Sequence, residues 1–321
     1  ATIFREMGEL GLLGATIPEA YGGAGLNYVC YGLVAREVER VDSGYRSMMS
    51  VQSSLVMVPI FEFGTEAQKQ KYLTPLAQGK KDGELYVGAF LLSEPEAGSD
   101  ATHQHTSAVD KGDHYVLNGV KNWITNGSSA SVYLVIAQTD PAKGSRGINA
   151  FIVEKNSPGV TVGAKENKLG IRGSDTHSIM FNDVKVPKEN RIGEDGFGFK
   201  FAMKTLAGGR IGIAAQALGI ASGAYELALG YSKQRKAFGK EIYHHQAIAF
   251  KLADMFTEIE AAKLLVYDAA DRKDRGEKVT LQSATAKYYA SEVSVRVANE
   301  AVQIFGGYGF TKDFPAEKYY R

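Results

Sequence analysis

Residues 114–136 read HYVLNGVKNWITNGSSASVYLVI, and they decide the fold class of the chain. In this stretch, short runs of β-branched and aromatic residues are bounded by Gly, Asn and Ser, as is typical of β-strands. Similar runs recur at 150–153 and 177–181, inside a segment that extends from about 84 to 194. Strands this short and regular predict a small sheet sandwich or barrel.

On both sides of this segment, apolar residues recur every three or four positions, which predicts helices. Before it the pattern covers 1–77, and after it the long helical periods are richest at 214–234, 246–275 and 281–305. We therefore predict an α+β fold. Its parts would be an N-terminal α-helical domain at 1–84, a middle β-barrel or sandwich domain at 85–195 and a C-terminal helical bundle domain at 196–321.

Composition and charge exclude several classes of protein. The 321 residues carry 37 Lys and Arg against 36 Asp and Glu, so a net charge of +1 provides no field to hold nucleic acid. The single cysteine, Cys30, excludes an intrachain disulfide, and its apolar surroundings favour a core position over a nucleophile. No apolar run approaches the roughly 20 residues of a membrane helix, so we expect no membrane insertion. The chain begins at Ala1 rather than Met, and we expect its natural start, with any targeting sequence, upstream.

Motifs of the common nucleotide and metal sites are missing from the sequence. There is no Walker A loop and no Gly-x-Gly-x-x-Gly between a strand and a helix, so any dinucleotide must be bound in another way. The histidine pairs at 103/105 and 244/245 lack carboxylates at ligand spacing. We therefore expect surface or packing roles for these histidines and no metal site.

Three segments remain as candidates for chemistry. LSEPEAGSD at 92–100 is a polar turn with hydroxyl and backbone N–H donors, and NGVKNWITNG at 118–127 carries the single tryptophan, Trp123. A flat ring with hydrogen-bonding edges would fit between them, whereas the simpler alternative is a solvated turn and a tryptophan of the core. The third segment combines QRKAFG at 234–239 with QIFGGYG at 303–309. There an arginine beside a glycine-opened backbone can grip a pyrophosphate, although glycine at a helix end is also ordinary capping.

Taken together, these segments resemble the acyl-CoA dehydrogenase family of flavoproteins, in order and over essentially the whole chain. The SEPxxGSD turn, WITNG, Arg-x-x-Phe-Gly, Gln246 after two histidines and QIFGG occur at the family's relative spacing. The resemblance implies an N-terminal helical domain, a middle β domain and a C-terminal four-helix bundle. It also implies a homotetramer with FAD bound between the last two domains and across a subunit interface.

The family's binding residues are carried over onto this sequence one by one. Ser93, where the family usually has threonine, would bond the flavin ring edge, and Trp123 and Thr125 would contact the ring. Ser99 would serve the cofactor phosphate or the CoA chain, and Arg210 would lie near the acyl thioester. The residues implied for FAD are Phe90, Leu92, Ser93, Ser99, Trp123, Ile124, Thr125, Arg235, Phe238, Gln246, Gln303, Ile304, Phe305, Gly306 and Gly307. The arginine, the glutamines and the glycines of this set would hold the pyrophosphate and adenosine of a neighbouring subunit's FAD, together with Phe238.

The implied activity is α,β-dehydrogenation of an acyl-CoA, in which a carboxylate removes the α-proton and the β-hydrogen leaves as hydride to the flavin. The family's usual base is a glutamate shortly after the stretch that ends at Arg321, so we expect it beyond the given sequence and assign no catalytic residue within it. An alternative position for the base, directly before Arg210, holds Gly209. Ala207 stands where relatives generally have an aspartate that contacts the pantetheine arm, which predicts weaker CoA affinity.

Two substrate classes remain open. After about residue 83 the chain resembles short-chain, butyryl-CoA dehydrogenases, whereas residues 40–55 resemble glutaryl-CoA dehydrogenase; a mosaic of two genes is a further possibility. In the glutaryl subfamily Arg46 and Ser50 would bind the distal carboxylate of the substrate, and Glu39 would orient the arginine. On one continuous helix, positions 39, 43, 46 and 50 share a face. The alternative is that Glu39 and Arg46 form a surface ion pair worth under about 1 kcal/mol.

The resemblance also implies an electron acceptor and a location, and two alternative functions remain. Electrons would pass to an electron-transfer flavoprotein, in the bacterial cytoplasm or, for a eukaryotic protein, the mitochondrial matrix. A same-fold acyl-CoA oxidase, which gives electrons to oxygen, is the nearest alternative. A flavin- or CoA-binding protein without turnover is a third possibility if the polypeptide ends at Arg321.

Overall fold

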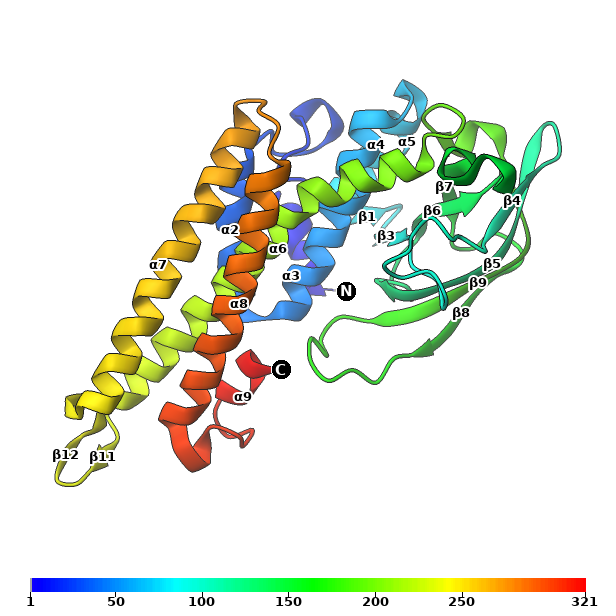
Figure 1. Ribbon diagram of the computed structural model, residues 1–321. Coiled ribbons are helices and arrows are strands. Elements are labelled where there is room, and N and C mark those ends of the chain that lie inside the picture. The colour runs from blue at the N-terminus through cyan, green and yellow to red at the C-terminus, as the bar shows by residue number, and fades with distance from the viewer. Residues whose placement is uncertain (1) are drawn as a thin grey trace. The chain divides into compact units, whose positions relative to one another are not determined.

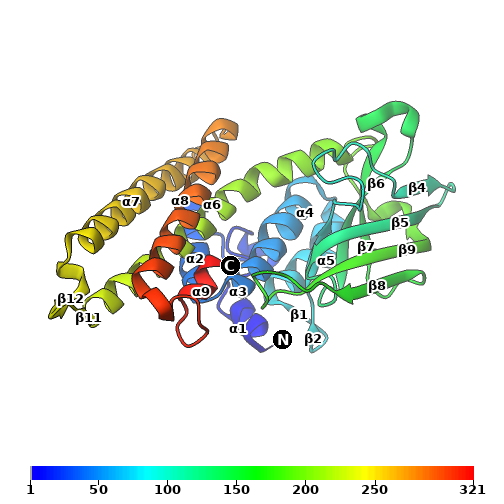
Figure 2. The same cartoon turned by 60° about the horizontal axis from the view of Figure 1, so that its bottom comes forward.

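The computed structural model describes residues 2–321, which divide into two compact units. Unit 1 comprises the residues up to Leu26, Ser47–Asn167 and Arg172–Gly209, and unit 2 comprises Asn27–Arg46, Lys168–Ile171 and Arg210–Arg321. The chain runs from helices through strands and back to helices (Figures 1 and 2). The predicted α+β fold is confirmed, while the exact domain limits at 84 and 195 stay predictions.

Several helices of unit 1 precede its sheet in the chain. They are α1 (Thr2–Glu9), a π-helical turn at Val51–Met57, α4 (Val58–Phe63) and α5 (Glu66–Gln78). In α5, a capping box joins Thr65 and Gln68 at the start, and Gly79 ends the helix at a φ of 65°. Side-chain capping satisfies backbone donors that a first turn leaves free, and glycine adopts a positive φ without strain. The residues at the two ends of α5 therefore determine where the helix begins and ends.

The eight-stranded sheet of unit 1 supplies its hydrophobic core. Its strands are β3 (Gly88–Leu91), β4 (Ser107–Asp110), β5 (His114–Thr125), β6 (Val132–Gln138), β7 (Ile148–Glu154), β8 (Val160–Lys165), β9 (Thr176–Pro187) and β10 (Arg191–Ile192). They follow the order β10-β7-β6-β4-β5-β9-β8, and β3 pairs with β6 in parallel. The predicted strands are confirmed, but β5 and β9 are longer than predicted. Their pairing has register shifts between Leu117 and Gly119 and between Lys121 and Ile124, which locally bend the strands.

Unit 2 consists mainly of long helices. They are α2 (Tyr28–Val41), α7 (Gln246–Asp274), α8 (Thr280–Phe305) and the short α9 (Ala316–Tyr320). Helix α6 (Gly198–Ser232) extends from unit 1 into unit 2. Helices α7 and α8 lie side by side in both views (Figures 1 and 2), and a small hairpin of β11 (Lys236–Ala237) and β12 (Lys240–Glu241) precedes α7. A further hairpin, β1 (Lys80–Lys81) with β2 (Glu84–Leu85), belongs to unit 1.

The helical pattern predicted over residues 1–77 is interrupted at Asp42. Helix α2 ends at Val41, Asp42 is extended with φ −163° and ψ 127°, and α3 (Ser43–Ser50) begins after it. The Asp42 carboxylate accepts a hydrogen bond from the backbone N–H of Gly44 at 2.7 Å, as an N-cap does. One continuous helix for positions 39 to 50 was therefore a wrong expectation. Cys30, expected in the core, is only half-buried in the first turn of α2.

One helix among the described residues, α6, is long and apolar enough to cross a membrane when judged by length and composition. About two thirds of its apolar stretch, 67%, is buried inside the protein, as in the core helix of a globular fold. This finding is weak evidence for a membrane segment.

Candidate functional site

The turn after β3 and the last part of β5 are joined by direct bonds. The backbone N–H of Asn122 donates to the carbonyl of Ser93 at 2.9 Å, and the ammonium of Lys121 donates to the carbonyl of Leu92 at 3.0 Å. The same ammonium donates to Oε1 of Glu94 at 2.7 Å. The two segments that the sequence singled out as a ring site are thus brought together in unit 1.

Trp123 does not belong to the core. Its φ is +62°, a conformation that non-glycine residues rarely adopt, and 62% of the residue is exposed. Between Lys121 and Ile124 the strand contains one residue more than its partner β9, which pairs Lys121 with Ile179 and Ile124 with His177. Such a bulge re-aims side chains. The alternative of a core tryptophan is therefore wrong, and the indole face is available to a ligand.

The other residues predicted for the ring lie on the same elements. Phe90 on β3, Leu92 and Thr125 are half-buried, so part of each faces outward. Ile124 is buried in the core of the sheet. Ser99 is exposed near the end of the polar turn. These positions are compatible with the predicted roles and do not test them.

A pocket of unit 2 gathers most of the residues predicted for the pyrophosphate. Its lining includes Arg235 and Phe238 from the hairpin region and the run from Gln303 to Gly307 at the end of α8, which comprises Ile304, Phe305 and Gly306 as well. Gln246, the first residue of α7, is exposed and is not part of this lining. Residues 65 or more positions apart in the sequence thus line one pocket.

This pocket fits an anionic group. Gly306 has a φ of +59°, and a Cβ atom placed on Gly306 or Gly307 would meet nothing within 4 Å. Open glycine backbone of this kind lets a phosphate approach closely. The guanidinium of Arg235 is exposed, and the described part of the chain places no acidic group in a salt bridge with it. A cation without an acidic partner beside an open backbone is what a pyrophosphate requires.

Arg46 and Glu39 form a buried pair in unit 2. Each is 1% exposed, and Nε of Arg46 lies 4.0 Å from Oε2 of Glu39. Nη1 of Arg46 donates to the carbonyl of Gly212 at 3.3 Å and to Oε1 of Gln216 at 3.1 Å, while Ser43 donates to Glu39. The alternative of a surface ion pair is therefore wrong.

Burial shifts the pKa values of both groups in this pair. Desolvation raises the pKa of Glu39 to about 7, against the opposing effects of the Ser43 hydrogen bond and the Arg46 charge. Desolvation lowers the pKa of Arg46 from its ordinary value, against the Tyr31 and Glu39 contributions. Burial thus disfavours the charged form of each group.

Two further residues predicted for the substrate lie on helices α3 and α6. Ser50 is buried at the end of α3, and Arg210 is half-buried on α6, two residues before Gly212. Their roles toward a substrate stay predictions.

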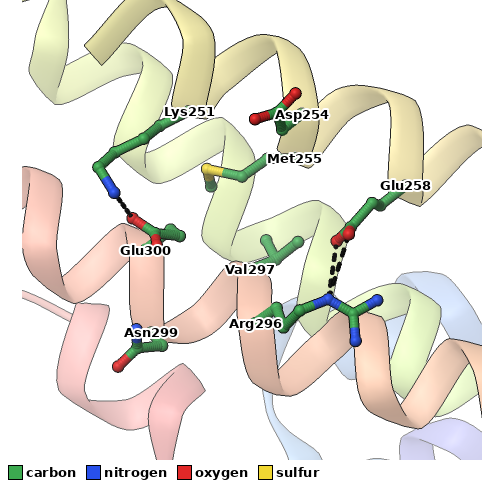
Figure 3. Close-up of a pocket in the computed structure, with 8 residues that line it drawn as sticks. All are labelled: Lys251, Asp254, Met255, Glu258, Arg296, Val297, Asn299 and Glu300. Atoms are coloured by element: carbon green, nitrogen blue, oxygen red, sulfur yellow. Dashed lines mark hydrogen bonds and ion pairs between the residues drawn. The ribbon is translucent and has the colours of Figure 1, made fainter. Parts of the chain in front are cut away.

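A hollow between α7 and α8 contains none of the predicted residues. Lys251 of α7 pairs with Glu300 of α8, and Arg296 of α8 pairs with Glu258 of α7 at 3.1 Å (Figure 3). Because these cations already have carboxylate partners, we interpret the ion pairs as contacts that hold the two helices together, and we do not assign the hollow as a binding site. Residues 2–321 contain no cluster of three or more His, Cys, Asp and Glu side chains with metal-site geometry.

Lys121 and Glu94 were missed as functional candidates. Both are buried, Lys121 completely, on β5 and in the turn after β3. A signal was present, because a lysine two positions before Trp123 falls among strand residues where charge is rare. Its partner could not be identified without the fold.

Three family models match the chain in the order of its parts. They describe the acyl-CoA dehydrogenase N-terminal domain over residues 1–80, the middle domain over 89–184 and the C-terminal domain over 196–321. The chain belongs to the acyl-CoA dehydrogenase family. The resemblance carried by SEPxxGSD, WITNG and QIFGG is thereby confirmed.

Relatives within the acyl-CoA dehydrogenase family are similar over almost the whole chain. The short-chain specific acyl-CoA dehydrogenase of Megasphaera elsdenii is 51% identical over 99% of this chain and 83% of its own length. The structure of butyryl-CoA dehydrogenase from that organism has a TM-score of 0.96 at 50% identity, covering 99% of this chain and 83% of the other. A chain in the structure of the electron transferring flavoprotein of Acidaminococcus fermentans has the same TM-score at 51% identity, with the same coverage of 99% and 83%.

A glutaryl-coenzyme A dehydrogenase in complex with glutaryl-CoA is also similar. Its TM-score is 0.94 at 38% identity, over 98% of this chain and 80% of the other. The fold is therefore shared by both substrate classes, and the higher identity lies with the short-chain acyl-CoA dehydrogenases.

Proposed function

We propose that this acyl-CoA dehydrogenase oxidises a short-chain, butyryl-like acyl-CoA to the enoyl-CoA with FAD as cofactor. The observation that carries the proposal is the outward Trp123 on a bulge, next to Asn122, whose N–H bonds the carbonyl of Ser93 in the polar turn. Identity near 50% to short-chain and butyryl-CoA dehydrogenases supports the substrate class.

Bound FAD would supply the hydride acceptor that no side chain provides. In this chain Ser93, Trp123 and Thr125 would hold the ring, and Arg235 with Gly306 would hold a pyrophosphate. Arg210 would serve the acyl thioester. No described residue is proposed as the general base.

Exposed apolar surfaces support the proposal of a homotetramer. Phe238 is 95% exposed at the tip of the β11–β12 hairpin, although its φ of +54° is unfavourable for a bulky residue. On α8, the side chains of Leu281, Tyr288 and Val295 recur every seven residues and all are exposed. Helical apolar stripes of this kind usually mark protein contacts. A second copy of the chain is the proposed occupant, with Arg235 serving its FAD.

An electron-transfer flavoprotein is the proposed electron acceptor. A chain of closely similar structure occurs in the Acidaminococcus electron transferring flavoprotein structure. The location proposed from the resemblance is the bacterial cytoplasm or, in a eukaryote, the mitochondrial matrix.

Glutaryl-CoA is the second candidate substrate, because the buried Arg46 favours it. Arg46 Nε has no hydrogen-bond partner among the described residues, and a buried donor of this kind suits a carboxylate ligand. The direct test of the proposal is anaerobic addition of butyryl-CoA or glutaryl-CoA to the FAD-loaded full-length protein. We expect bleaching of the flavin absorption with butyryl-CoA. No bleaching with either thioester would contradict the proposed reaction, and rapid reoxidation in air would favour the oxidase alternative.

A further inference from the structure

The ammonium of Lys121 is fully buried and has three acceptors. Nζ donates to the carbonyl of Leu92 at 3.0 Å, to Oε1 of Glu94 at 2.7 Å and to Oε1 of Gln104. A protonated lysine has three N–H donors, so each donor has one partner. The charge is therefore held in one geometry.

Glu94 connects this ammonium to a third segment. Its carboxylate accepts from the backbone N–H of His105 at 2.6 Å and from that of Thr106 at 3.0 Å. One ion pair thus joins the 92–94 turn, the 104–106 segment and β5. Apolar residues of similar volume often replace a buried ion pair without loss of stability, so stability alone does not explain why such a pair is present.

The residues next to Lys121 are those of the ring site. Asn122 N–H bonds the carbonyl of Ser93 at 2.9 Å, and Trp123 follows on the bulge. A shift of the Lys121 side chain would therefore move the Ser93 turn relative to the Trp123 platform. The ion pair is buried below the residues of the ring site. The Lys121 ammonium is not exposed, so it cannot contact a ligand directly.

We propose that Lys121 is a positioning residue of the flavin site, which, with Glu94, keeps the Ser93 turn and the Trp123 bulge in the geometry that binds the flavin ring. The inference rests on the proposed function, since it requires that FAD bind at these segments. It assigns Lys121 no contact with the reacting atoms.

Protonation of Lys121 is expected to control this geometry. Desolvation lowers the pKa of Lys121 to about 8, against the opposing charge and hydrogen bond of Glu94. Glu94 is the charged group that contacts the ammonium; β9 places Ile179 opposite, and the 104–106 segment contributes Gln104. His105 lies toward Glu96, with its ring nitrogen 3.6 Å from that carboxylate. A neutral amine has two N–H donors for three acceptors, so one bond is lost as the pH rises through about 8.

Stability and flavin affinity should respond to this deprotonation in opposite directions. A lysine whose pKa is lowered in the folded state loses its proton before the unfolded chain does, so its contribution to the free energy of unfolding rises above pH 8. Flavin affinity should fall over the same range, because the anchor is weaker. A purely structural lysine would change stability without changing flavin affinity.

The experiment measures the Kd of the apoprotein for FAD by fluorescence, the spectrum of bound flavin and the melting temperature, at pH 7 and pH 9. Lys121→Met removes the charge and keeps the length of the stem. Lys121→Arg keeps its charge over this pH range. Asn149→Ala is the matched control, because Asn149 is equally buried in the same sheet and bonds Asp195 at 2.9 Å and Gly196 N–H at 3.0 Å.

We expect the Kd of the wild type to rise severalfold from pH 7 to pH 9. Lys121→Met should raise the Kd at least tenfold at pH 7 and flatten the pH profile, and Lys121→Arg should also lack the pH dependence. Asn149→Ala should lower the melting temperature and leave the Kd within twofold. If Lys121→Met does not fold, the inference is tested by the pH dependence of the Kd for FAD in the wild type and in Lys121→Arg.

Three outcomes overturn the inference. A wild-type Kd that is equal at pH 7 and pH 9 removes the role of the charge. A Lys121→Met protein that binds FAD like the wild type, or that loses affinity only as much as Asn149→Ala does, makes the lysine merely structural. If the wild type itself does not bind FAD, the proposed function fails, and this inference fails with it.

Discussion

Nε of Arg46 and Oε2 of Glu39 lie 4.0 Å apart in the interior of unit 2, and neither atom has a hydrogen-bond partner among the described residues. An ion pair of this length gains less than a hydrogen-bonded one, while both groups bear the cost of desolvation. Ser43 donates to the other carboxylate oxygen of Glu39, and Gln216 accepts from Nη1 of Arg46. The two unpartnered atoms distinguish this pair from Lys121 and Glu94, whose bonds are complete.

The stability of Glu39→Gln should differ from that of the wild type in a pH-dependent way. Because the pKa of Glu39 is raised to about 7, the folded protein holds a proton that the unfolded chain releases near pH 4.5. The Glu39 contribution is thus present at low pH and lost as pH rises through 7. Relative to the wild type, the variant should gain at most about 3 kcal/mol between pH 5 and pH 8, since one pKa unit is worth about 1.4 kcal/mol.

Urea unfolding at pH 5 and pH 8 checks this prediction for Glu39. The exposed Glu37→Gln variant serves as control and should show a constant difference from the wild type over this range. An equal effect of Glu39→Gln at both pH values would show that Glu39 does not titrate between them in the folded protein.

Trp123→Ala should weaken flavin binding with little effect on stability. The side chain is mostly exposed, so its removal should change the free energy of unfolding by about 0.5 kcal/mol or less. An aromatic contact with the ring would be worth roughly 0.5–1.5 kcal/mol beyond its buried area. Titration of the apoprotein with FAD should give a Kd several times higher, and Trp123→Phe should be intermediate. A large fall in melting temperature with unchanged Kd would return Trp123 to a structural role.

Arg235→Ala should lower the FAD content of the purified protein. Loss of the guanidinium leaves the pyrophosphate charge without a charge-assisted bond of about 1.5–3 kcal/mol, or roughly a tenfold or greater change in Kd. The ratio of flavin absorbance to protein measures the content. Lys240→Ala, which removes a cation from the same hairpin but outside the pocket, should retain FAD. Equal flavin content in both variants would exclude Arg235 from the cofactor site.

Periodicity predicted the elements of this fold but not the direction of its key side chains. The apolar runs of β6 and β7 are buried along nearly their whole length, so composition alone identifies them. The outward direction of the Trp123 side chain depends on a one-residue mismatch between β5 and β9. The paired residues that flank it are 53 and 58 positions apart, so no local sequence feature reveals their register. A hydrophobic residue on a strand is therefore assigned to the core by default, and the bulge reverses that assignment.

The partners of the buried charged residues were equally difficult to predict from the sequence. The carboxylate of Asp42 could have indicated the break between α2 and α3, because aspartate before serine is a common helix start. The pairing of Lys121 with Glu94 could not be predicted, since it joins residues 27 positions apart through the sheet. Arg46 and Glu39 were identified by resemblance, and the structure shows that they meet although no single helix joins them.

A charge placed in the apolar stripe of α8 should disrupt the proposed tetramer. Tyr288→Glu with Val295→Glu would bury two carboxylates at the contact, which is costly without partners. Light scattering after size-exclusion chromatography should report a smaller species. Lys287→Glu, exposed next to the stripe, is the control and should leave the assembly intact. An unchanged mass in the double variant would show that α8 faces solvent.

Arg46 decides between the two substrate classes. If a substrate carboxylate reaches Arg46, glutaryl-CoA gains a charge-assisted hydrogen bond of roughly 1.5–3 kcal/mol, and butyryl-CoA leaves the buried guanidinium without it. Arg46→Met keeps much of the volume and removes the charge, and the double variant Arg46→Met/Glu39→Gln avoids an unpaired Glu39. For a glutaryl-CoA enzyme, both variants should lower kcat/KM for glutaryl-CoA about ten- to hundredfold and spare butyryl-CoA. For the short-chain enzyme that we propose, the wild type should prefer butyryl-CoA and the double variant should keep that preference, because Arg46 is then a packing residue held by Gly212 and Gln216.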